Sequence, residues 1–146
     1  MKTPIGDTPE EALANMKRRA VGKSGFSTFA VAEPVEIWDG YAELTVEIRP
    51  ELTQHHGYAH GAIVGMVADN ACAWAAASVA GDVLTAGYAI NFLAPAKGQR
   101  LRGKGWVIKP GKRQIVCRAE VWSEDDDGSK PVLVASAQGT VMAVSR

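Results

Sequence analysis

The sequence predicts an α+β domain in which one curved antiparallel sheet wraps around a long central helix. Residues 62–80 are apolar on every side, so this segment is expected to be a buried helix. Two strand-like segments precede it and four follow it. Short turns join these segments, and strands joined by short turns pair antiparallel. A single sheet folded around the helix is therefore the simplest packing.

The chain is expected to form one domain over residues 1–146, because this length matches one compact unit with a normal core. Within it, residues 1 to about 25 are expected to be an N-terminal helix and linker. The 16 basic and 16 acidic residues cancel. This balance indicates neither a nucleic-acid-binding surface nor a polybasic membrane anchor.

The two cysteines predict a reducing environment. Cys72 and Cys117 are isolated in the sequence and lack the spacing of metal ligands, so free buried thiols are expected. Polar residues follow Met1 and Lys2, which predicts no signal peptide. We therefore expect a cytoplasmic protein.

The N-terminal helix has a recognisable start. Thr8 is the expected cap, and Glu11 completes a capping box with it. The helix is expected to reach about Ala20, and the glycines Gly22 and Gly25 are expected to break it.

Period-two alternation marks the strands. Residues 41–49 alternate between apolar and polar, and Asp39-Gly40 is the expected hairpin turn after a strand at 34–38. Gly81-Asp82 is expected to end the long helix. Four further strands are predicted at 84–93, 100–109, 113–123 and 131–144.

Asp69 is the strongest functional signal, because it is one carboxylate in the middle of the apolar helix. Burying a carboxylate is costly unless the group is paired or used. A central Asp also disfavours membrane insertion by roughly 2.5–3.5 kcal/mol. The segment is therefore interpreted as the core helix of a soluble protein.

Helix geometry separates Asp69 from His60. Nine residues correspond to about 13 Å of rise and about 900° of rotation, so the two side chains face opposite sides. If both act on one substrate, they come from two chains. Antiparallel pairing of two such helices places Asp69 of one chain near His60 and Gly61 of the other, which predicts an obligate dimer with two equivalent sites.

The start of the long helix offers hydrogen-bond donors. The backbone N–H groups of Gly61 and Ala62 are expected to be free at the positive end of the helix dipole. Such a site can stabilise a developing oxyanion in acyl transfer. A carboxylate opposite these donors can act as a general base or as a nucleophile.

These residues resemble a known family. The segment Gln54-His55-His56-Gly57-Tyr58-Ala59-His60-Gly61-Ala62, followed by Asp69-Asn70, resembles the hotdog-fold acyl-CoA thioesterases, in particular the phenylacetate-pathway-like group. That group carries a His-Gly-Gly motif followed by an Asp or Glu on the hotdog helix. Residues 90–96 are also similar to the strand that follows this helix in the family. The resemblance covers roughly residues 30–146.

The resemblance implies a role for each matching residue. Asp69 would be the catalytic carboxylate, and the Gly61 N–H would be the oxyanion donor. His60 would fix the motif loop near the thioester. Gln54 would orient the water or the carbonyl, and Thr85 would help to hold the water.

The remaining substrate contacts are expected at Ala62, Asn70, Lys112 and Arg113. Ala62 replaces the second glycine of the family motif, and Gln54 is longer than the Asn that is common at its position. Lys112 and Arg113 follow Pro110-Gly111 and are the preferred contacts for the phosphates of coenzyme A. No metal or redox cofactor is expected, since coenzyme A is part of the substrate.

Structural roles remain as alternatives for several of these residues. Asp69 could bond a neighbouring strand, and His60 could be only a loop anchor or cap. Cys72 is expected to pack in the core and not to act as a nucleophile. A metal site is possible by residue type, since His and Asp are common metal ligands, and the candidates are His55, His56, His60 and Asp69. However, His60 and Asp69 face opposite sides of the helix, which disfavours a shared metal site.

Two other function classes remain open. A hotdog-fold enoyl-CoA hydratase or dehydratase would share the architecture, and a non-catalytic acyl-CoA-binding module would share the binding site. The expected assembly is at least a homodimer and by preference a homotetramer, whose dimers could pair through sheets or through helices.

Overall fold

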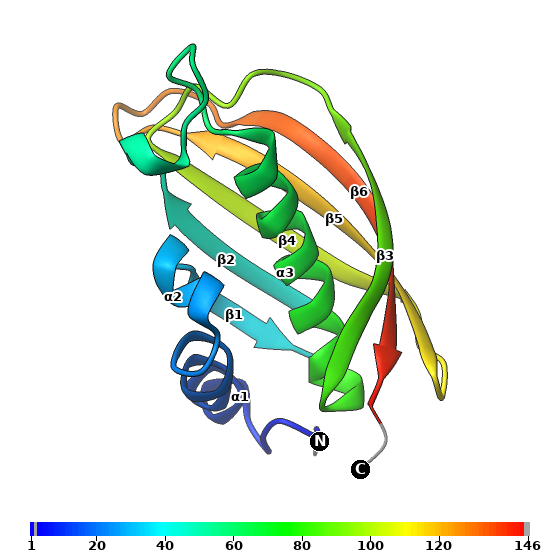
Figure 1. Cartoon of the computed structure of the whole chain (residues 1–146). Helices are drawn as coiled ribbons and strands as arrows, with labels where there is room; N and C mark the ends of the chain where they lie inside the picture. Colours follow the sequence, from blue (N-terminus) through cyan, green and yellow to red (C-terminus); the bar gives the residue numbers. More distant parts are fainter. Residues whose placement is uncertain (2, 145–146) are drawn as a thin grey trace.

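The computed structural model describes residue 1 and residues 3–144. In this part of the chain, six antiparallel strands form one sheet in the order β1-β2-β4-β5-β6-β3, and the sheet curves around α3 (Figure 1). The architecture expected from the sequence is therefore confirmed. The elements in chain order are α1 Pro9–Met16, a π-helical turn Lys17–Val21, α2 Gly25–Ala30, β1 Glu33–Trp38, β2 Tyr41–Glu47, a 3-10 turn Pro50–Leu52, α3 Gly61–Ala80, β3 Val83–Phe92, β4 Arg100–Lys109, β5 Gln114–Glu124 and β6 Val132–Ala143.

The N-terminal segment contains one helix that the sequence did not predict. The α1 cap forms as expected, because the Thr8 hydroxyl accepts a hydrogen bond from the backbone N–H of Glu11. Gly22 ends the first helical segment as expected, because it follows the π-helical turn as its C-cap, whereas Gly25 is the first residue of α2. The hydroxyl of Ser24 caps α2 by accepting from the N–H of Ser27, which compensates for the poor helix propensity of glycine.

The β1–β2 hairpin forms as predicted. Its turn residues Asp39 and Gly40 have φ angles of 46° and 83°. Two consecutive positive φ values match the primed turns that fit the twist of a two-residue hairpin. Aspartate and glycine tolerate this backbone conformation better than most residues do.

Glycines in β4 allow α3 to lie deep in the sheet. A Cβ atom on Gly105 would stand 2.2 Å from the carbonyl oxygen of Ala71, and one on Gly103 would stand 2.6 Å from a methyl carbon of Val67. Any side chain at these positions would push the helix outward. The helix is long and apolar enough for a membrane span, but 72% of its most apolar window is buried inside the fold. It is a core helix.

The two edge strands of the sheet differ in how they are covered. Helix α1 lies beside β1 (Figure 1). The outer edge of β3 has no neighbouring strand among the described residues. On β3, the large side chains Leu84, Tyr88 and Phe92 are 67%, 44% and 57% exposed. The sheet therefore ends in a ten-residue strand with a largely apolar surface.

Candidate functional site

Asp69 lies about halfway along α3 and faces β3. It is half-buried, and its carboxylate oxygen Oδ1 accepts a hydrogen bond of 2.6 Å from the hydroxyl of Thr85. No basic side chain pairs with Asp69 among the described residues. The carboxylate is thus held in place by a neutral donor and keeps its charge uncompensated.

A β-bulge turns Thr85 toward the helix. The pairing of β3 with β6 shifts between Thr85 and Gly87, so Ala86 is an extra residue in the strand. Without it, the alternation of side chains would place Thr85 on the opposite face from Tyr88 and Phe92. The extra residue reverses the alternation of side chains on one side of the bulge, so the side chains of residues 85, 88 and 92 all face α3.

Glycines on α3 lie opposite the aromatic residues of β3. The ring of Phe92 lies 3.4 Å from the Cβ position of Gly61, and the hydroxyl of Tyr88 lies 3.0 Å from that of Gly65. Gly61, Gly65 and Asp69 are spaced by four residues and share one side of the helix. This row of α3 and the facing row of β3 form a seam that ends at the Asp69–Thr85 pair.

The start of α3 retains one free donor. The Nδ1 atom of His60 accepts from the N–H of Ala62 at 2.9 Å, and the backbone carbonyl of His60 accepts from Ile63 and Val64. Within the described residues, the N–H of Gly61 has no acceptor. The expectation of two free donors is therefore wrong for Ala62, whose N–H is occupied by the helix cap.

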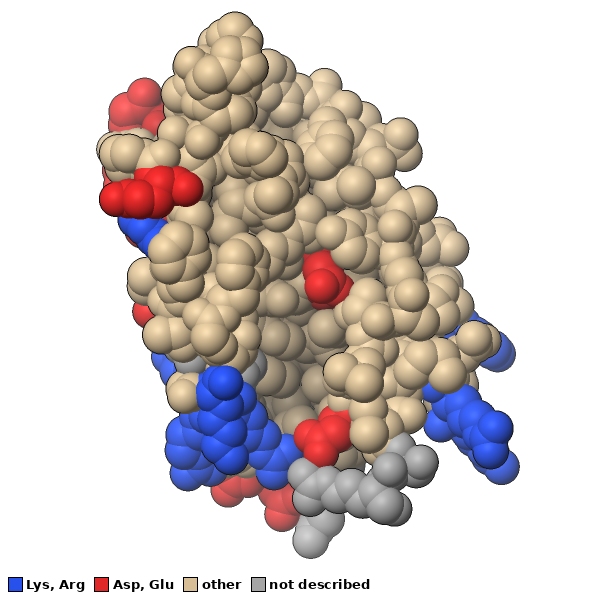
Figure 2. Space-filling view, viewed as in Figure 1, with Lys and Arg blue, Asp and Glu red and all other residues tan. Residues whose placement is uncertain are grey.

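A pocket of about 500 Å³ adjoins this free donor. Its lining is mainly apolar and includes Gly61, Tyr58, Phe92 and Leu93, with Gln54 as a polar member. Figure 2 shows the face over α3 and β3 as largely uncharged, with acidic groups in its hollow and basic side chains mainly around the lower half. An apolar pocket beside a few polar groups is typical of a small-molecule site.

Two predicted site residues already have partners within the chain. The side-chain oxygen of Gln54 accepts from the N–H of His56 at 2.5 Å, which stabilises the loop before α3. The amide of Asn70 donates to the hydroxyl of Ser27 at 3.3 Å and so joins α3 to α2. Gln54 lines the pocket, whereas the observed role of Asn70 is to anchor α2.

The two preferred phosphate ligands lie far from Gly61 in the same chain. Lys112 and Arg113 are exposed in the β4–β5 turn. This turn lies at the end of the molecule where α3 finishes, opposite the loop that precedes Gly61 (Figure 1). A substrate held at Gly61 cannot use both ends of one chain, so these two residues could serve only a site shared between subunits.

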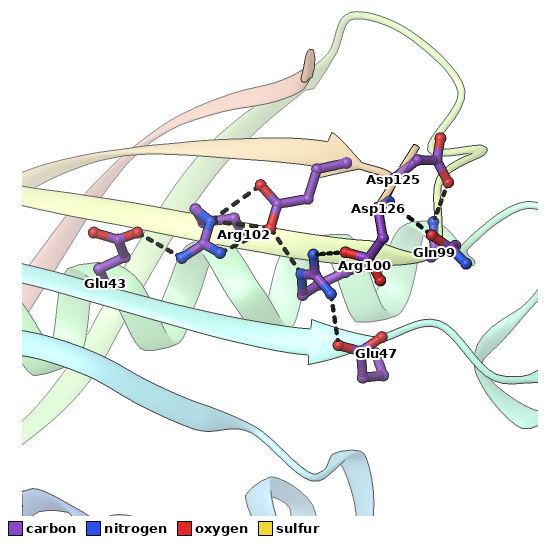
Figure 3. Close-up of polar contacts among 8 residues, drawn as sticks. Glu43, Glu47, Gln99, Arg100, Arg102, Asp125 and Asp126 are labelled. Carbon is purple, nitrogen blue, oxygen red and sulfur yellow. Dashed lines mark hydrogen bonds and ion pairs between the residues drawn. The ribbon is translucent and has the colours of Figure 1, made fainter. Parts of the chain in front are cut away.

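Other basic residues are neutralised on the outer face of the sheet. Arg102 bonds Glu43 at 2.7 Å and Glu124 at 2.8 Å, and Arg100 bonds Glu124, Glu47 and Asp126. Figure 3 shows these side chains on the face of the sheet turned away from α3. The hydrogen bonds from Arg102, followed by those from Arg100, lower the pKa of Glu124 despite its partial burial. We call this group the outer-face network.

Neither cysteine has the environment of a nucleophile. Burial raises the pKa of Cys72 to about 12 and that of Cys117 to about 11. Both thiols are free and buried. Among residues 1 and 3–144, no group of three or more His, Cys, Asp or Glu side chains is arranged to hold a metal ion.

Some residues around the site were not identified from the sequence. Tyr88 and Phe92 cover the glycine row, and Lys97 lies 5.1 Å above the ring of Tyr58 at the pocket. The spacing of two aromatic residues four apart on a strand is a signal for a shared face. Lys97 belongs to a basic stretch between residues 97 and 113 that the sequence offers as possible phosphate contacts, but Lys112 and Arg113 were preferred over it.

Comparisons with known proteins agree on one family. A sequence model of the thioesterase superfamily matches residues 56–130, which is just over half of the chain. A solved structure of a thioesterase family protein from Silicibacter pomeroyi is 31% identical, covers 92% of this chain and 99% of its own, and superposes with a TM-score of 0.85. No curated protein matches the sequence.

More distant structures extend this likeness. A conserved protein from Pseudomonas aeruginosa is 28% identical, with 86% of this chain and 98% of its own covered at a TM-score of 0.75. The PaaI protein of the phenylacetic acid degradation operon of E. coli is 21% identical, with 85% and 87% covered at a TM-score of 0.75. At 21% identity, the likeness to the PaaI protein shows a shared fold alone.

Proposed function

This chain belongs to the thioesterase superfamily and has the hotdog fold, and we propose that it hydrolyses an acyl-CoA thioester to a free acid and coenzyme A. One observation carries the proposal. Asp69 is a half-buried carboxylate that has no cationic partner among residues 1 and 3–144, and Thr85 holds it inside an apolar seam. A purely structural carboxylate is normally neutralised, whereas a catalytic base must stay available.

The proposed reaction uses one group from each end of the seam, Asp69 as the base and the N–H of Gly61 as the oxyanion donor. Asp69 removes a proton from a water molecule, which attacks the thioester carbonyl carbon. The N–H of Gly61 stabilises the oxyanion that forms. The C–S bond then breaks, and the proton held by Asp69 passes to the leaving thiolate. Direct attack by Asp69 on the thioester, which forms an anhydride and releases the thiolate of coenzyme A, is the alternative. In a single turnover in ¹⁸O-water, ¹⁸O in the Asp69 carboxylate and an unlabelled product acid would indicate an anhydride that water opens at the Asp69 carbonyl.

The site is proposed to form between two chains. Asp69 lies eight residues beyond Gly61, which corresponds to about 12 Å of rise along α3. One water molecule and one thioester carbonyl cannot bridge this distance by direct hydrogen bonds. In an antiparallel pair, Asp69 of one chain would approach Gly61 of its partner, and both sites would be equivalent.

The bare edge of β3 supports such a dimer. It is long, it has no neighbouring strand among the described residues, and it exposes Leu84, Tyr88 and Phe92. Proteins usually protect an apolar strand edge of this kind, because it can pair with another chain. Pairing through β3 would cover it and would bring the two seams together.

The assembly, the cellular location and the cofactor requirement are also proposed. We propose a homodimer at least and a homotetramer as the full assembly, in the cytoplasm, where the two free thiols would stay reduced. The reaction needs no metal or redox cofactor and involves neither nucleic acid nor a membrane.

A hydrolysis screen tests the proposed function. The protein is incubated with short, medium, long and aromatic acyl-CoAs, and free thiol is measured over time. We expect turnover of at least one class. Hydration of an enoyl-CoA without thiol release would support the hydratase alternative. Tight acyl-CoA binding without any turnover would support the binding-module alternative.

A further inference from the structure

A second pocket shares lining residues with the pocket beside Gly61. It measures about 380 Å³ and lies between the β3–β4 turn and the β5–β6 turn. Ala94 and Pro95 line both pockets. A ligand held at Gly61 can therefore extend past Pro95 into this second pocket without leaving the surface of the same chain.

The second pocket is the basic end of this path. Lys97 and Lys130 both line it, one from each turn, together with the hydroxyl-bearing Ser129. The ammonium group of Lys97 also lies 5.1 Å from the ring centroid of Tyr58, which lines the first pocket. Lys97 thus stands at the junction between the apolar and the polar parts of the path.

The charges of both lysines remain available. Neither Lys97 nor Lys130 has an ion pair among the residues that the structure describes. Arg100, which begins the neighbouring strand, is neutralised by the outer-face network. An anion that reaches this region therefore meets two ammonium groups that form no ion pair within the described part of the chain.

The nearby acidic residues are engaged elsewhere. Asp125 lines the pocket, but its Oδ1 accepts the backbone N–H of Gln99 at 3.0 Å. Asp126 pairs with Arg100 at 2.6 Å, and Asp127 accepts the N–H of Ser129 at 2.9 Å. A backbone N–H does not neutralise a carboxylate, so Asp125 and Asp127 keep their negative charges. Lys97 and Lys130 are the cationic side chains that line the pocket.

We infer that Lys97 and Lys130 bind the phosphate groups of coenzyme A. This inference rests on the proposed function and replaces Lys112 and Arg113 as the phosphate contacts. The apolar pocket takes the part of the substrate next to the thioester, and the pantetheine arm passes Pro95. Ammonium groups on flexible side chains suit a mobile, multiply charged phosphate end.

A pair of matched substrates tests this assignment. The variant Lys97→Ala/Lys130→Ala is compared with wild type on an acyl-CoA and on the same acyl group carried by N-acetylcysteamine, which lacks the phosphates. We expect kcat/KM for the acyl-CoA to fall about tenfold, mainly through KM. The value for the short thioester stays unchanged. An equal fall on both substrates, or none on the acyl-CoA, would overturn the inference.

Two further variants control for charge and position. Lys17→Ala/Lys23→Ala removes the same two charges from exposed positions in the N-terminal segment, and its KM for acyl-CoA is expected to match wild type. Lys112→Ala/Arg113→Ala tests the rival placement. If that variant, and not Lys97→Ala/Lys130→Ala, shows the loss specific to acyl-CoA, the assignment is wrong.

Calorimetric titration with free coenzyme A separates the two proposals. We expect the Kd of the Lys97→Ala/Lys130→Ala variant to be about tenfold weaker than that of wild type, and the difference to shrink in high salt. If wild type binds coenzyme A through these lysines but hydrolyses no acyl-CoA, the proposed function fails and this inference stands. Equal binding by both proteins would overturn the inference.

Discussion

Asp69 and Glu124 are two carboxylates in one small protein, and their surroundings are opposite. Glu124 lies on the outer face of the sheet, where two arginines bond it at 2.8 Å. Asp69 lies in the seam between α3 and β3, where its described partner is the hydroxyl of Thr85. Both are shielded from solvent in part, so burial alone does not distinguish them.

The difference indicates what each carboxylate can do. A carboxylate fixed by two guanidinium groups has its lone pairs occupied and its charge cancelled, so it stabilises the fold. A carboxylate oriented by one hydroxyl keeps a free oxygen that can accept a proton. The outer-face network is therefore expected to stabilise the fold, whereas Asp69 is left available for the proposed chemistry.

Replacing the proposed catalytic carboxylate is expected to have the largest effect. Asp69→Asn keeps the size and the hydrogen bond from Thr85 but removes the base. We expect kcat to fall by roughly 10²–10⁴ while folding and dimerisation are kept. Glu124→Gln is the matched control, with kcat close to wild type. Near-normal turnover by Asp69→Asn would show that Asp69 is not the catalytic base.

Removing the N–H of Gly61, which has no acceptor among the described residues, tests the other end of the seam. Gly61→Pro deletes the N–H at a helix position that tolerates proline, and His60 has the extended backbone (φ −63°, ψ 142°) that suits a following proline. We expect kcat to fall by about 10²–10³. Gly61→Ala, which keeps the N–H, is the control. Equal losses in both variants would indicate crowding against Phe92 as the cause.

The hydroxyl that orients Asp69 is expected to matter less. Thr85→Val has a similar shape but cannot donate to the carboxylate. We expect kcat to fall about tenfold with little change in KM, which corresponds to about 1.4 kcal/mol. Thr85→Ser restores the donor and should recover most of the rate. Turnover by the valine variant that equals wild type would remove Thr85 from the site.

The smallest effect on activity is expected for Glu124→Gln, whose main consequence is a loss of stability that depends on pH. Because the pKa of Glu124 is lowered below its usual 4.5 in the folded chain, its contribution is complete above that pH. It is lost as the pH falls through the folded-state pKa. We expect Glu124→Gln to cost about 1–2 kcal/mol of unfolding free energy near neutral pH. Denaturant titrations should show this gap closing below about pH 4; a gap independent of pH would contradict the assignment.

The architecture was predictable because it follows from local patterns. The apolar helix and the alternation of β2 each have a periodicity that any sheet-and-helix packing preserves. The Asp39-Gly40 turn requires positive φ angles, and its residue types indicate this directly. The helix α2 was not predicted, because its six residues are too few to show periodicity and it begins with a glycine.

The candidate site was predictable in its residues but less so in its geometry. Asp69, Gly61 and Thr85 were named from the sequence, yet the facing of Thr85 depends on the extra residue Ala86, which alternation alone does not indicate. The N–H of Ala62 is taken by the imidazole of its own helix cap, a competition that residue types leave open. Likewise, the path to Lys97 and Lys130 joins two turns far apart in sequence.

Mixing two inactive variants tests the central claim, that Asp69 and Gly61 act together from different chains. Asp69→Asn and Gly61→Pro subunits are combined one to one and allowed to form mixed dimers. Each mixed dimer then has one site with both residues intact, so the account predicts recovery of about a quarter of the wild-type rate. A mixture no more active than its two parents, with mixed dimers shown to be present, would contradict it.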